Sequence, residues 1–142
     1  MTPPLVVDEE LRQIMGVALG EYPGIILDAR LHTTETGAIQ KLRLHIVDGS
    51  FLDIWLSTSG RYSYHWEHRH ISGRIYRHDN APHEKWRKLK TFPRHFHNGS
   101  EDNVEESDLP DSPKAAVGTF LNWIMSHILV EYDANRMFRQ EA

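Results

Sequence analysis

Apolar and polar side chains alternate in five consecutive segments of the chain, residues 25–32, 41–47, 51–57, 61–67 and 74–78. Alternation with a period of two is typical of a β-strand that buries one face and exposes the other. The connections are short, and two of them carry the turn pairs Asp48-Gly49 and Ser59-Gly60, which favour hairpins. The sequence therefore predicts a five-stranded antiparallel meander with one buried face.

Two segments with helical spacing flank the predicted sheet. Asp8 is the predicted N-cap of the first helix, which Gly20 and Pro23 end. The last helix is predicted to begin after Ser112, with Pro113 in its first turn. Because both helices must bury an apolar face, we expect an α+β fold with the N-terminal and C-terminal helices packed on one face of the sheet.

The length of 142 residues suits one domain. We therefore expect residues 1–142 to form a single α+β domain, with fraying at 1–7 and 131–142. Residues 79–112 contain prolines and an Asn-Gly pair and are predicted to be an ordered loop.

Composition excludes several classes of protein. The absence of cysteine rules out disulfide scaffolds, cysteine zinc sites, iron–sulfur clusters and thiol nucleophiles. No apolar run approaches the roughly 18 residues that a membrane span needs, and the first ten residues do not resemble a signal peptide. We therefore expect a cytoplasmic protein without a membrane partner.

Charge and histidine are concentrated in the middle of the chain. Residues 61–97 hold nine Lys or Arg, three acids and seven of the ten histidines, whereas residues 98–112 hold six acids and no Lys or Arg. A basic stretch in an acidic protein indicates a surface for phosphate groups. The alternative is an ordinary solvated face with compensating neighbours.

The polar face of the predicted sheet offers a candidate catalytic site. His65 and Glu67 are two residues apart on one strand and therefore share a face, where the carboxylate would orient the imidazole and raise its pKa. If Tyr76 points inward, Arg77 joins them, and His83 follows at the end of the next strand. A base, an acid and an arginine are what metal-independent ribonucleases need. The alternative is a surface His–Glu pair without function.

A second set of residues is predicted to contact nucleic acid. Aromatic and basic side chains can stack on bases and bind phosphates, and an acidic residue stands at the mouth of the basic face. The set comprises Trp55, Arg61, Asp79, Arg94, His95 and His97. For Asp79, an Asx-type turn is an equally good interpretation.

Two His-x-His pairs leave a metal site open as an alternative. They are His68 with His70, and His95 with His97. Such pairs can bind zinc when a third ligand is present, and Asp79 or His83 could supply it. The default interpretation is that these histidines anchor loops, so no metal and no cofactor are expected.

Four segments resemble the TumE family of toxin–antitoxin proteins: LDIWLSTSGRYSYHWE, YRHDNAPH, TFPRHFHNGSEDNV and SPKAAVGTFL. The resemblance covers roughly residues 25–130. It implies a toxin of a two-gene module that works beside a DNA-binding antitoxin, and it carries over no catalytic residues.

Two functions follow as hypotheses. The first is a toxin that cleaves RNA as an endoribonuclease, through His65, Glu67, Arg77 and His83. The second is a non-catalytic module that binds nucleic acid or the antitoxin. A homodimer is also expected, because an open meander leaves edge strands to cover.

Overall fold

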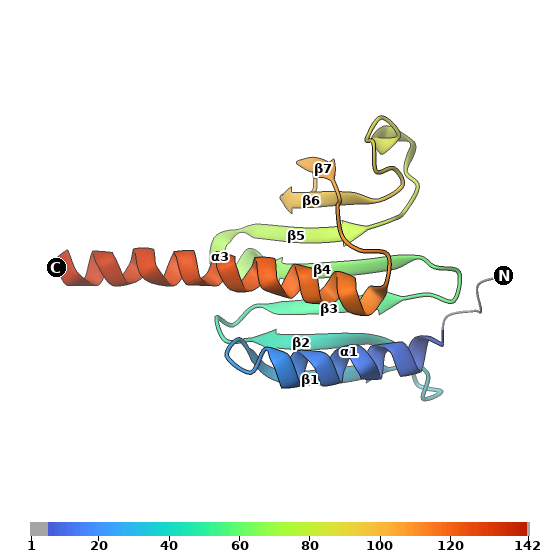
Figure 1. The fold of residues 1–142 in the computed structure, drawn as a ribbon, viewed down its shortest axis with the longest axis horizontal. Helices are drawn as coiled ribbons and strands as arrows, with labels where there is room; N and C mark the ends of the chain where they lie inside the picture. The colour runs from blue at the N-terminus through green and yellow to red at the C-terminus, as the bar shows by residue number, and fades with distance from the viewer. Residues whose placement is uncertain (1–5, 142) are drawn as a thin grey trace.

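The computed structural model describes residues 6–141, and side chains from residue 6 to residue 130. One antiparallel sheet has seven strands in sequential order, and α1 (Val7–Glu21) and α3 (Pro113–Glu141) lie across one of its faces (Figure 1). The strands are β1 (Ile26–Thr33), β2 (Ile39–Ile46), β3 (Phe51–Leu56), β4 (Tyr62–His68), β5 (Arg74–Asp79), β6 (His95–Gly99) and β7 (Val104–Glu106). Two short helices, α2 (Arg69–Ser72) and η1 (Glu84–Trp86), lie in the connections. The α+β prediction is confirmed, but the sheet has seven strands, not five.

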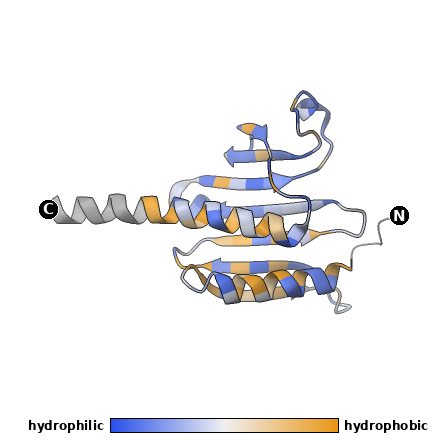
Figure 2. Ribbon diagram, viewed as in Figure 1, coloured by the Kyte–Doolittle hydropathy of each residue, from blue (hydrophilic) through white to orange (hydrophobic). Residues whose placement is uncertain are grey.

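Strands β2, β3 and β4 follow the predicted alternation (Figure 2). β1 and β5 depart from it, because Leu27 is exposed and both sides of β5 are largely buried. Leu42 pairs with Ile54 and Leu44 with Leu52, and all four side chains are fully buried under the helices. The predicted turn is also present: Gly49 has a φ of 92°, a left-handed conformation that glycine adopts without strain. The polar residues between these apolar ones therefore lie on the opposite face of the sheet.

The two outer strands differ in regularity from the central ones. The pairing of β1 with β2 has register shifts between Ile26 and Asp28 and between His32 and Thr33. At the other edge, β7 has three residues, and Glu105 and Glu106 are exposed.

The additional strands β6 and β7 replace part of the predicted loop 79–112. In β6, Phe96 faces the core, where its ring stacks on that of His78 with centroids 4.0 Å apart. His95 and His97 point to the other face, because side chains alternate along a strand. The sequence pattern concealed this strand, since histidine takes the place of the usual polar residues and only one apolar residue marks the buried side.

The helix boundaries are close to those predicted. α1 begins two residues earlier than expected, with Val6 as its N-cap, so the prediction of Asp8 as N-cap is wrong. Asp8 lies in the first turn with Glu9 and Glu10, where negative charge is favourable. Ser112 precedes α3 as predicted, and its Oγ accepts a hydrogen bond from the Ala115 N–H at 3.3 Å. The expected fraying falls largely outside the described side chains and remains a prediction.

Trp66 is the centre of the core. Its side chain is fully buried, and its Nε1–H donates a hydrogen bond to Ser50 Oγ at 2.8 Å. Its ring contacts Tyr76 of β5 and Trp123 of α3, at centroid distances of 5.0 and 6.1 Å. These contacts join the sheet to the C-terminal helix, so the polar face is supported by a rigid layer beneath it.

On the polar face, Asp53 joins two strands through ion pairs. It accepts hydrogen bonds from Arg43 Nε at 2.7 Å and from Lys41 Nζ at 2.9 Å. Burial alone would raise the pKa of Asp53, but hydrogen bonds from Arg43 and Lys41 outweigh it and lower that pKa. The ion pairs therefore stabilise the fold at pH values above the ordinary aspartate pKa of about 3.9. This contribution is lost as the pH falls through the lowered pKa of Asp53 in the folded protein.

We expect Asp53→Asn to reduce the free energy of unfolding by about 1–2 kcal/mol at pH 7. The difference from the unsubstituted protein should shrink as the pH falls below about 4, because protonation removes the same charge. Urea unfolding at several pH values measures this. Asp28→Asn, in the exposed pair with Arg30, is the matched control and should leave stability unchanged. An equal effect of both substitutions would contradict the prediction.

Candidate functional site

The register of the sheet places five charged or titratable side chains in one row on the polar face. Directly opposite neighbours across β2 to β6 are Arg43, Asp53, His65, Arg77 and His97. This row follows from the period-two alternation together with uninterrupted antiparallel pairing. The row brings together His65 and Arg77, as predicted, and adds His97 from β6.

Arg77 connects most of the polar groups on this part of the sheet. Its Nε donates to Asp79 Oδ2 at 3.0 Å, and Nη1 and Nη2 donate to the two carboxylate oxygens of Glu101 at 2.9 and 2.6 Å. Nη1 also lies 3.4 Å from His65 Nδ1. Hydrogen bonds from Arg77 to Glu101 raise the pKa of the guanidinium further, with burial opposing and Asp79 adding to the effect. Arg77 is therefore a permanent positive charge held between two carboxylates.

His65 is held as a neutral base. Its Nε2 lies 3.3 Å from Glu67 Oε1, so Nε2 carries the proton and Nδ1 can accept from Arg77. Burial is the main cause that lowers the pKa of His65, Glu67 opposes this, and Arg77 adds to it. The expectation that Glu67 raises this pKa above its ordinary value is therefore wrong, because desolvation outweighs the carboxylate.

Glu67 remains a carboxylate. Burial alone would raise the pKa of Glu67, but hydrogen bonds from the Arg69 N–H and from His65 hold it below its ordinary value. Glu67 thus fixes the ring of His65 and keeps its negative charge near neutral pH.

Asp79 ends β5 as a buried carboxylate. Oδ1 accepts from the Ala81 N–H at 3.0 Å, as expected for an Asx-type turn, and Oδ2 accepts from Arg77. Burial opposes ionisation, but the nearby His97 imidazole and hydrogen bonds from the Ala81 N–H and Arg77 lower the pKa of Asp79 to about 2. His95 Nε2 lies 3.0 Å from Oδ1, and His97 Nε2 lies 3.6 Å from Oδ2.

His95 and His97 lie beneath the surface, with exposed fractions of 0% and 5%. Their Nδ1 atoms donate to the carbonyl oxygens of Pro93 at 2.8 Å and Glu101 at 2.9 Å. Both were expected to contact nucleic acid, but their depth gives them little surface to offer a polynucleotide. Together with Asp79 they form a group whose metal-ligating atoms lie within 4.8 Å of one another.

The other His-x-His pair holds a loop. His68 is buried, with Nε2 2.9 Å from Asp48 Oδ2, and His70 Nε2 lies 2.9 Å from the Gly49 carbonyl oxygen. Both side chains therefore secure the β2–β3 turn, which is the role taken as the default for these pairs.

Two adjoining pockets lie on the polar face. The Trp55 pocket is lined by Trp55, Arg61, Tyr62, Ser63, Arg77, Asp79, Asn80, Ala81 and His83. The Trp86 pocket is lined by Arg77, Asp79, His83, Lys85, Trp86, His97, Glu101 and Asp102. Arg77, Asp79 and His83 line both pockets. His65 and Glu67 line neither pocket and reach them only through the contact of His65 with Arg77.

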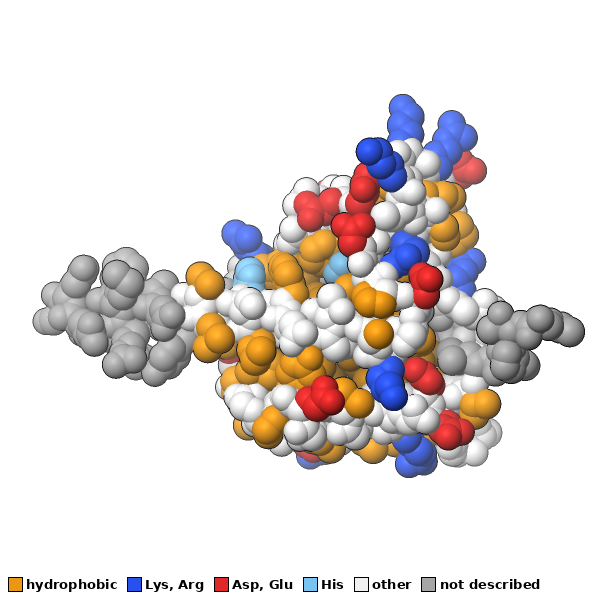
Figure 3. Space-filling view, in the orientation of Figure 1, with side chains coloured by type: hydrophobic (Ala, Val, Ile, Leu, Met, Phe, Trp, Pro, Cys, Tyr) orange, Lys and Arg blue, Asp and Glu red, His pale blue; other side chains and the backbone are white. Residues whose placement is uncertain are grey.

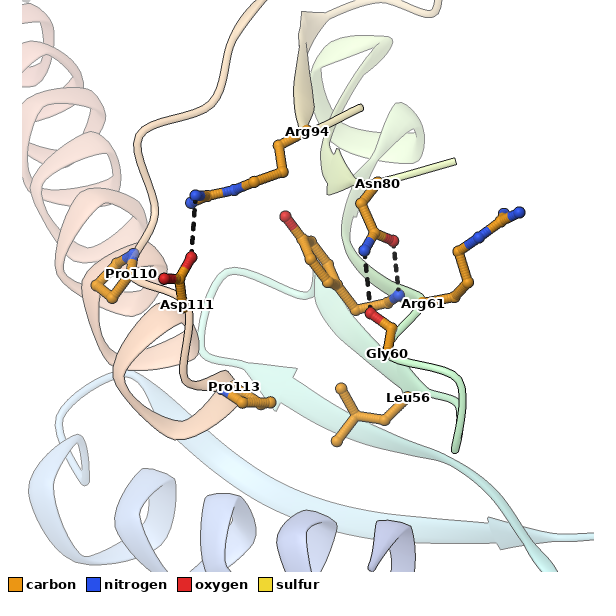
Figure 4. Close-up of a pocket in the computed structure, with 9 residues that line it drawn as sticks. Leu56, Gly60, Arg61, Asn80, Arg94, Pro110, Asp111 and Pro113 are labelled. Atoms are coloured by element: carbon orange, nitrogen blue, oxygen red, sulfur yellow. Dashed lines mark hydrogen bonds and ion pairs between the residues drawn. The ribbon is translucent and has the colours of Figure 1, made fainter. Parts of the chain in front are cut away.

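Arg94 lies in a different pocket, near the start of α3. Its Nη1 donates to Asp111 Oδ1 at 3.1 Å (Figure 4). The pocket is also lined by Leu56, Gly60, Arg61, Tyr62, Asn80, Pro110 and Pro113. In the same view the side chain of Arg61 points away from the Arg94–Asp111 pair. Arg94 shares this pocket with Arg61, which also lines the Trp55 pocket, whereas the other predicted site residues do not line it.

A basic loop, residues 84–90, stands beside the Trp86 pocket. Lys85, Arg87, Lys88 and Lys90 are exposed, and Lys and Arg side chains gather on this part of the molecule (Figure 3). Lys85, Trp86 and Glu101 were not predicted as site residues. The basic middle of the sequence could have indicated Lys85 as a site residue. No pattern in the sequence distinguishes Trp86 or Glu101 from other residues.

We expect two substitutions to move the pKa of His65 in opposite directions. Arg77→Gln should raise it, because a neighbouring positive charge is removed, and Glu67→Gln should lower it further, because the carboxylate favours the protonated ring. NMR titration of the imidazole signals measures both. The pKa of His32 on β1 serves as the internal control and should stay the same. Shifts of the same sign in both variants would contradict the contacts described.

A family model described as Toxin TumE matches residues 18–128 of the chain. No curated protein and no solved structure matches the chain. Among residues 6–141, no helix combines the length and apolar character needed to cross a membrane.

Proposed function

Because the chain belongs to the TumE family of toxins, we propose that it acts on RNA as an endoribonuclease. The proposed active site is the Trp55 pocket together with His65, which contacts Arg77 at the border of that pocket. The family makes it the toxin of a toxin–antitoxin module, which implies an antitoxin as partner. The proposal adds a substrate, a reaction and a site. Its action on RNA would take place in the cytoplasm.

The composition of the Trp55 pocket carries the proposal. Trp55 is 41% exposed, which is unusual for a tryptophan on a sheet and leaves its ring able to stack on a base. Arg61 and Arg77 bring two positive charges that can bind phosphate, and His83 is an exposed imidazole in the same pocket. A base platform, phosphate ligands and a proton carrier are the groups that RNA cleavage needs.

The proposed reaction is transfer of the phosphate to the neighbouring 2′-hydroxyl. A base takes the proton of the 2′-hydroxyl, the 2′-oxygen attacks phosphorus, and the bond to the 5′-oxygen breaks as an acid protonates that oxygen. The products are a 2′,3′-cyclic phosphate and a 5′-hydroxyl. We assign the acid to His83 and the base to His65, oriented by Glu67.

Arg77 connects the two histidines in this proposal. In the structure its fork binds the Glu101 carboxylate, which has the planar bidentate form that a phosphate also offers. When a phosphate replaces Glu101, Arg77 moves away from His65 and leaves the Nδ1 lone pair able to accept a proton. Glu101 therefore occupies the phosphate position in the absence of RNA.

The cleavage assay uses purified protein, cellular RNA and sequencing of the new ends. We expect 2′,3′-cyclic phosphate ends, and a loss of rate of about 10²–10⁴-fold in His83→Ala and in His65→Ala. His45→Ala, on the same face of the sheet at β2, is the matched control and should cleave normally. Intact RNA between pH 5.5 and 8 would overturn the enzymatic proposal.

A non-catalytic binding module is the second candidate function, and the exposed cations of the basic loop favour it. Such a module would bind RNA or an acidic antitoxin surface tightly, with strong salt dependence and no turnover. Binding without cleavage in the same assay would support it. In either case we propose that the partner is a DNA-binding antitoxin.

A further prediction concerns Glu101 as a competitor of phosphate. Glu101→Gln should tighten RNA binding about three- to tenfold, because the Arg77 guanidinium is released from its ion pair. Arg77→Gln should weaken binding and reduce the slope of log K against log salt concentration by about 1. Fluorescence anisotropy with a labelled, non-cleavable 2′-deoxy oligonucleotide measures both. Glu105→Gln removes the same charge from an exposed residue that contacts Asn98, and is the control. Equal tightening in both Glu variants would mean that only net charge matters.

A further inference from the structure

Asp79, His95 and His97 form a buried polar cluster with no assigned role in the proposed RNA cleavage. Their exposed fractions are 8%, 0% and 5%. Two adjacent strands supply them: Asp79 of β5 is directly opposite His95 of β6, and His97 is two residues further along β6. Burying a carboxylate is costly unless a cation compensates its charge. Arg77 does so at Oδ2 of Asp79, which leaves Oδ1 facing His95 without a cation that is always charged.

The hydrogen bonds of the two histidines fix their tautomers. A carbonyl oxygen can only accept, so the contacts to Pro93 and Glu101 place a proton on Nδ1 of each ring. In the neutral ring, Nε2 then carries a lone pair. This is the arrangement typical of metal-ligating histidines, in which the distal N–H binds a backbone carbonyl.

Both Nε2 atoms lie close to the Asp79 carboxylate. His95 Nε2 lies 3.0 Å from Oδ1, yet it is fully buried and makes no hydrogen bond within the described residues. Two acceptors at this separation repel each other unless a positive centre lies between or beside them. His97 Nε2 lies 3.6 Å from Oδ2 on the other side of the same carboxylate.

We propose that Asp79, His95 and His97 bind a divalent transition-metal ion, with Zn²⁺ as the first choice. Two ligands that each lie about 2.1 Å from a tetrahedral metal are about 3.4 Å apart. His95 Nε2 lies 3.0 Å from Oδ1 and His97 Nε2 lies 3.6 Å from Oδ2, and one ligand atom from each of the three residues can be chosen so that all lie within 4.8 Å of one another. Two imidazoles and one carboxylate suit zinc and its neighbours rather than Mg²⁺ or Ca²⁺.

The surroundings of Asp79 leave room for such an ion. Ala81 N–H uses one lone pair of Oδ1 and Arg77 uses one of Oδ2, so a lone pair remains on each oxygen. These two donors orient the carboxylate as outer-shell partners do at metal sites. Glu101 and Asp102, which line the adjoining Trp86 pocket, add negative charge nearby.

The site has an open side. Asp79 and His97 line the Trp86 pocket, so a fourth coordination position can be reached from it. Three protein ligands with one open position are typical of catalytic rather than structural zinc. Zinc ionises a bound water near neutral pH, and if the proposed function holds, that water would lie beside Arg77 and His83.

The test is a metal titration without RNA. Protein stripped with EDTA is titrated with Zn²⁺ by calorimetry and with Co²⁺ by visible absorption. We expect one ion per chain, a dissociation constant below about 10 µM, a higher thermal midpoint with Zn²⁺, and ¹⁵N shifts at Nε2 of His95 and His97. His97→Gln and Asp79→Asn should bind at least about tenfold more weakly, and His70→Gln should bind normally.

Two results would overturn the proposal. One is the absence of Zn²⁺ binding stronger than about 1 mM in the unsubstituted protein. The other is a His95 ring that carries protons on both nitrogens near neutral pH and is unaffected by Zn²⁺, because the cluster would then be an ion pair. Neither measurement needs a folded variant. A protein that binds Zn²⁺ but leaves RNA intact would overturn the ribonuclease proposal alone.

Discussion

The buried carboxylate of Asp79 is the group on which the polar side of this protein depends. It lies where β5 ends, accepts the Ala81 N–H that starts the following loop, and holds Arg77 by a second oxygen. Both pockets of the polar face share Asp79, and the imidazoles of β6 converge on it. An ionised group at this depth is stable only with these partners around it. The Asp79 side chain therefore links three features: the position of β6, the start of the loop that follows β5, and the direction of the Arg77 side chain.

The division of charge along the sequence has a simple structural explanation. The acidic segment 98–112 folds back on the basic segment, so that Glu101 pairs with Arg77 and Asp111 with Arg94. Arg77 and Arg94, two of the arginines predicted to bind phosphate, are thus already paired. Lys85, Arg87, Lys88 and Lys90 remain exposed in the basic loop. An incoming polyanion would meet these lysines and Arg87 first and Arg77 only after it displaces Glu101.

Period-two alternation was sufficient to predict five strands and the polar face with His65 and Arg77, and helical spacing was sufficient to predict the two flanking helices. It was not sufficient for β6, in which Phe96 alone marks the buried side and His95 and His97 occupy the positions of ordinary polar residues. Asp8 was misjudged as a cap because acidic residues are favourable both at the cap and in the first turn. The pKa of His65 was predicted in the wrong direction because desolvation depends on the packing around the ring, which spacing does not reveal. The separation of Arg94 from Asp79 is likewise a matter of side-chain direction, set by the contact with Asp111.

The irregular outer strands bear on how the sheet meets other molecules. A regular open edge would present a row of unpaired N–H and C=O groups, which invites strand addition and aggregation. Here the pairing of β1 with β2 is interrupted by two register shifts, and irregularities of this kind twist an edge away from a flat template. The opposite edge, β7, is three residues long and ends in two exposed glutamates. Both edges of the sheet are thus protected against strand addition. A second copy or an antitoxin therefore has a better docking surface on the helices, the pockets or the basic loop than at an edge strand.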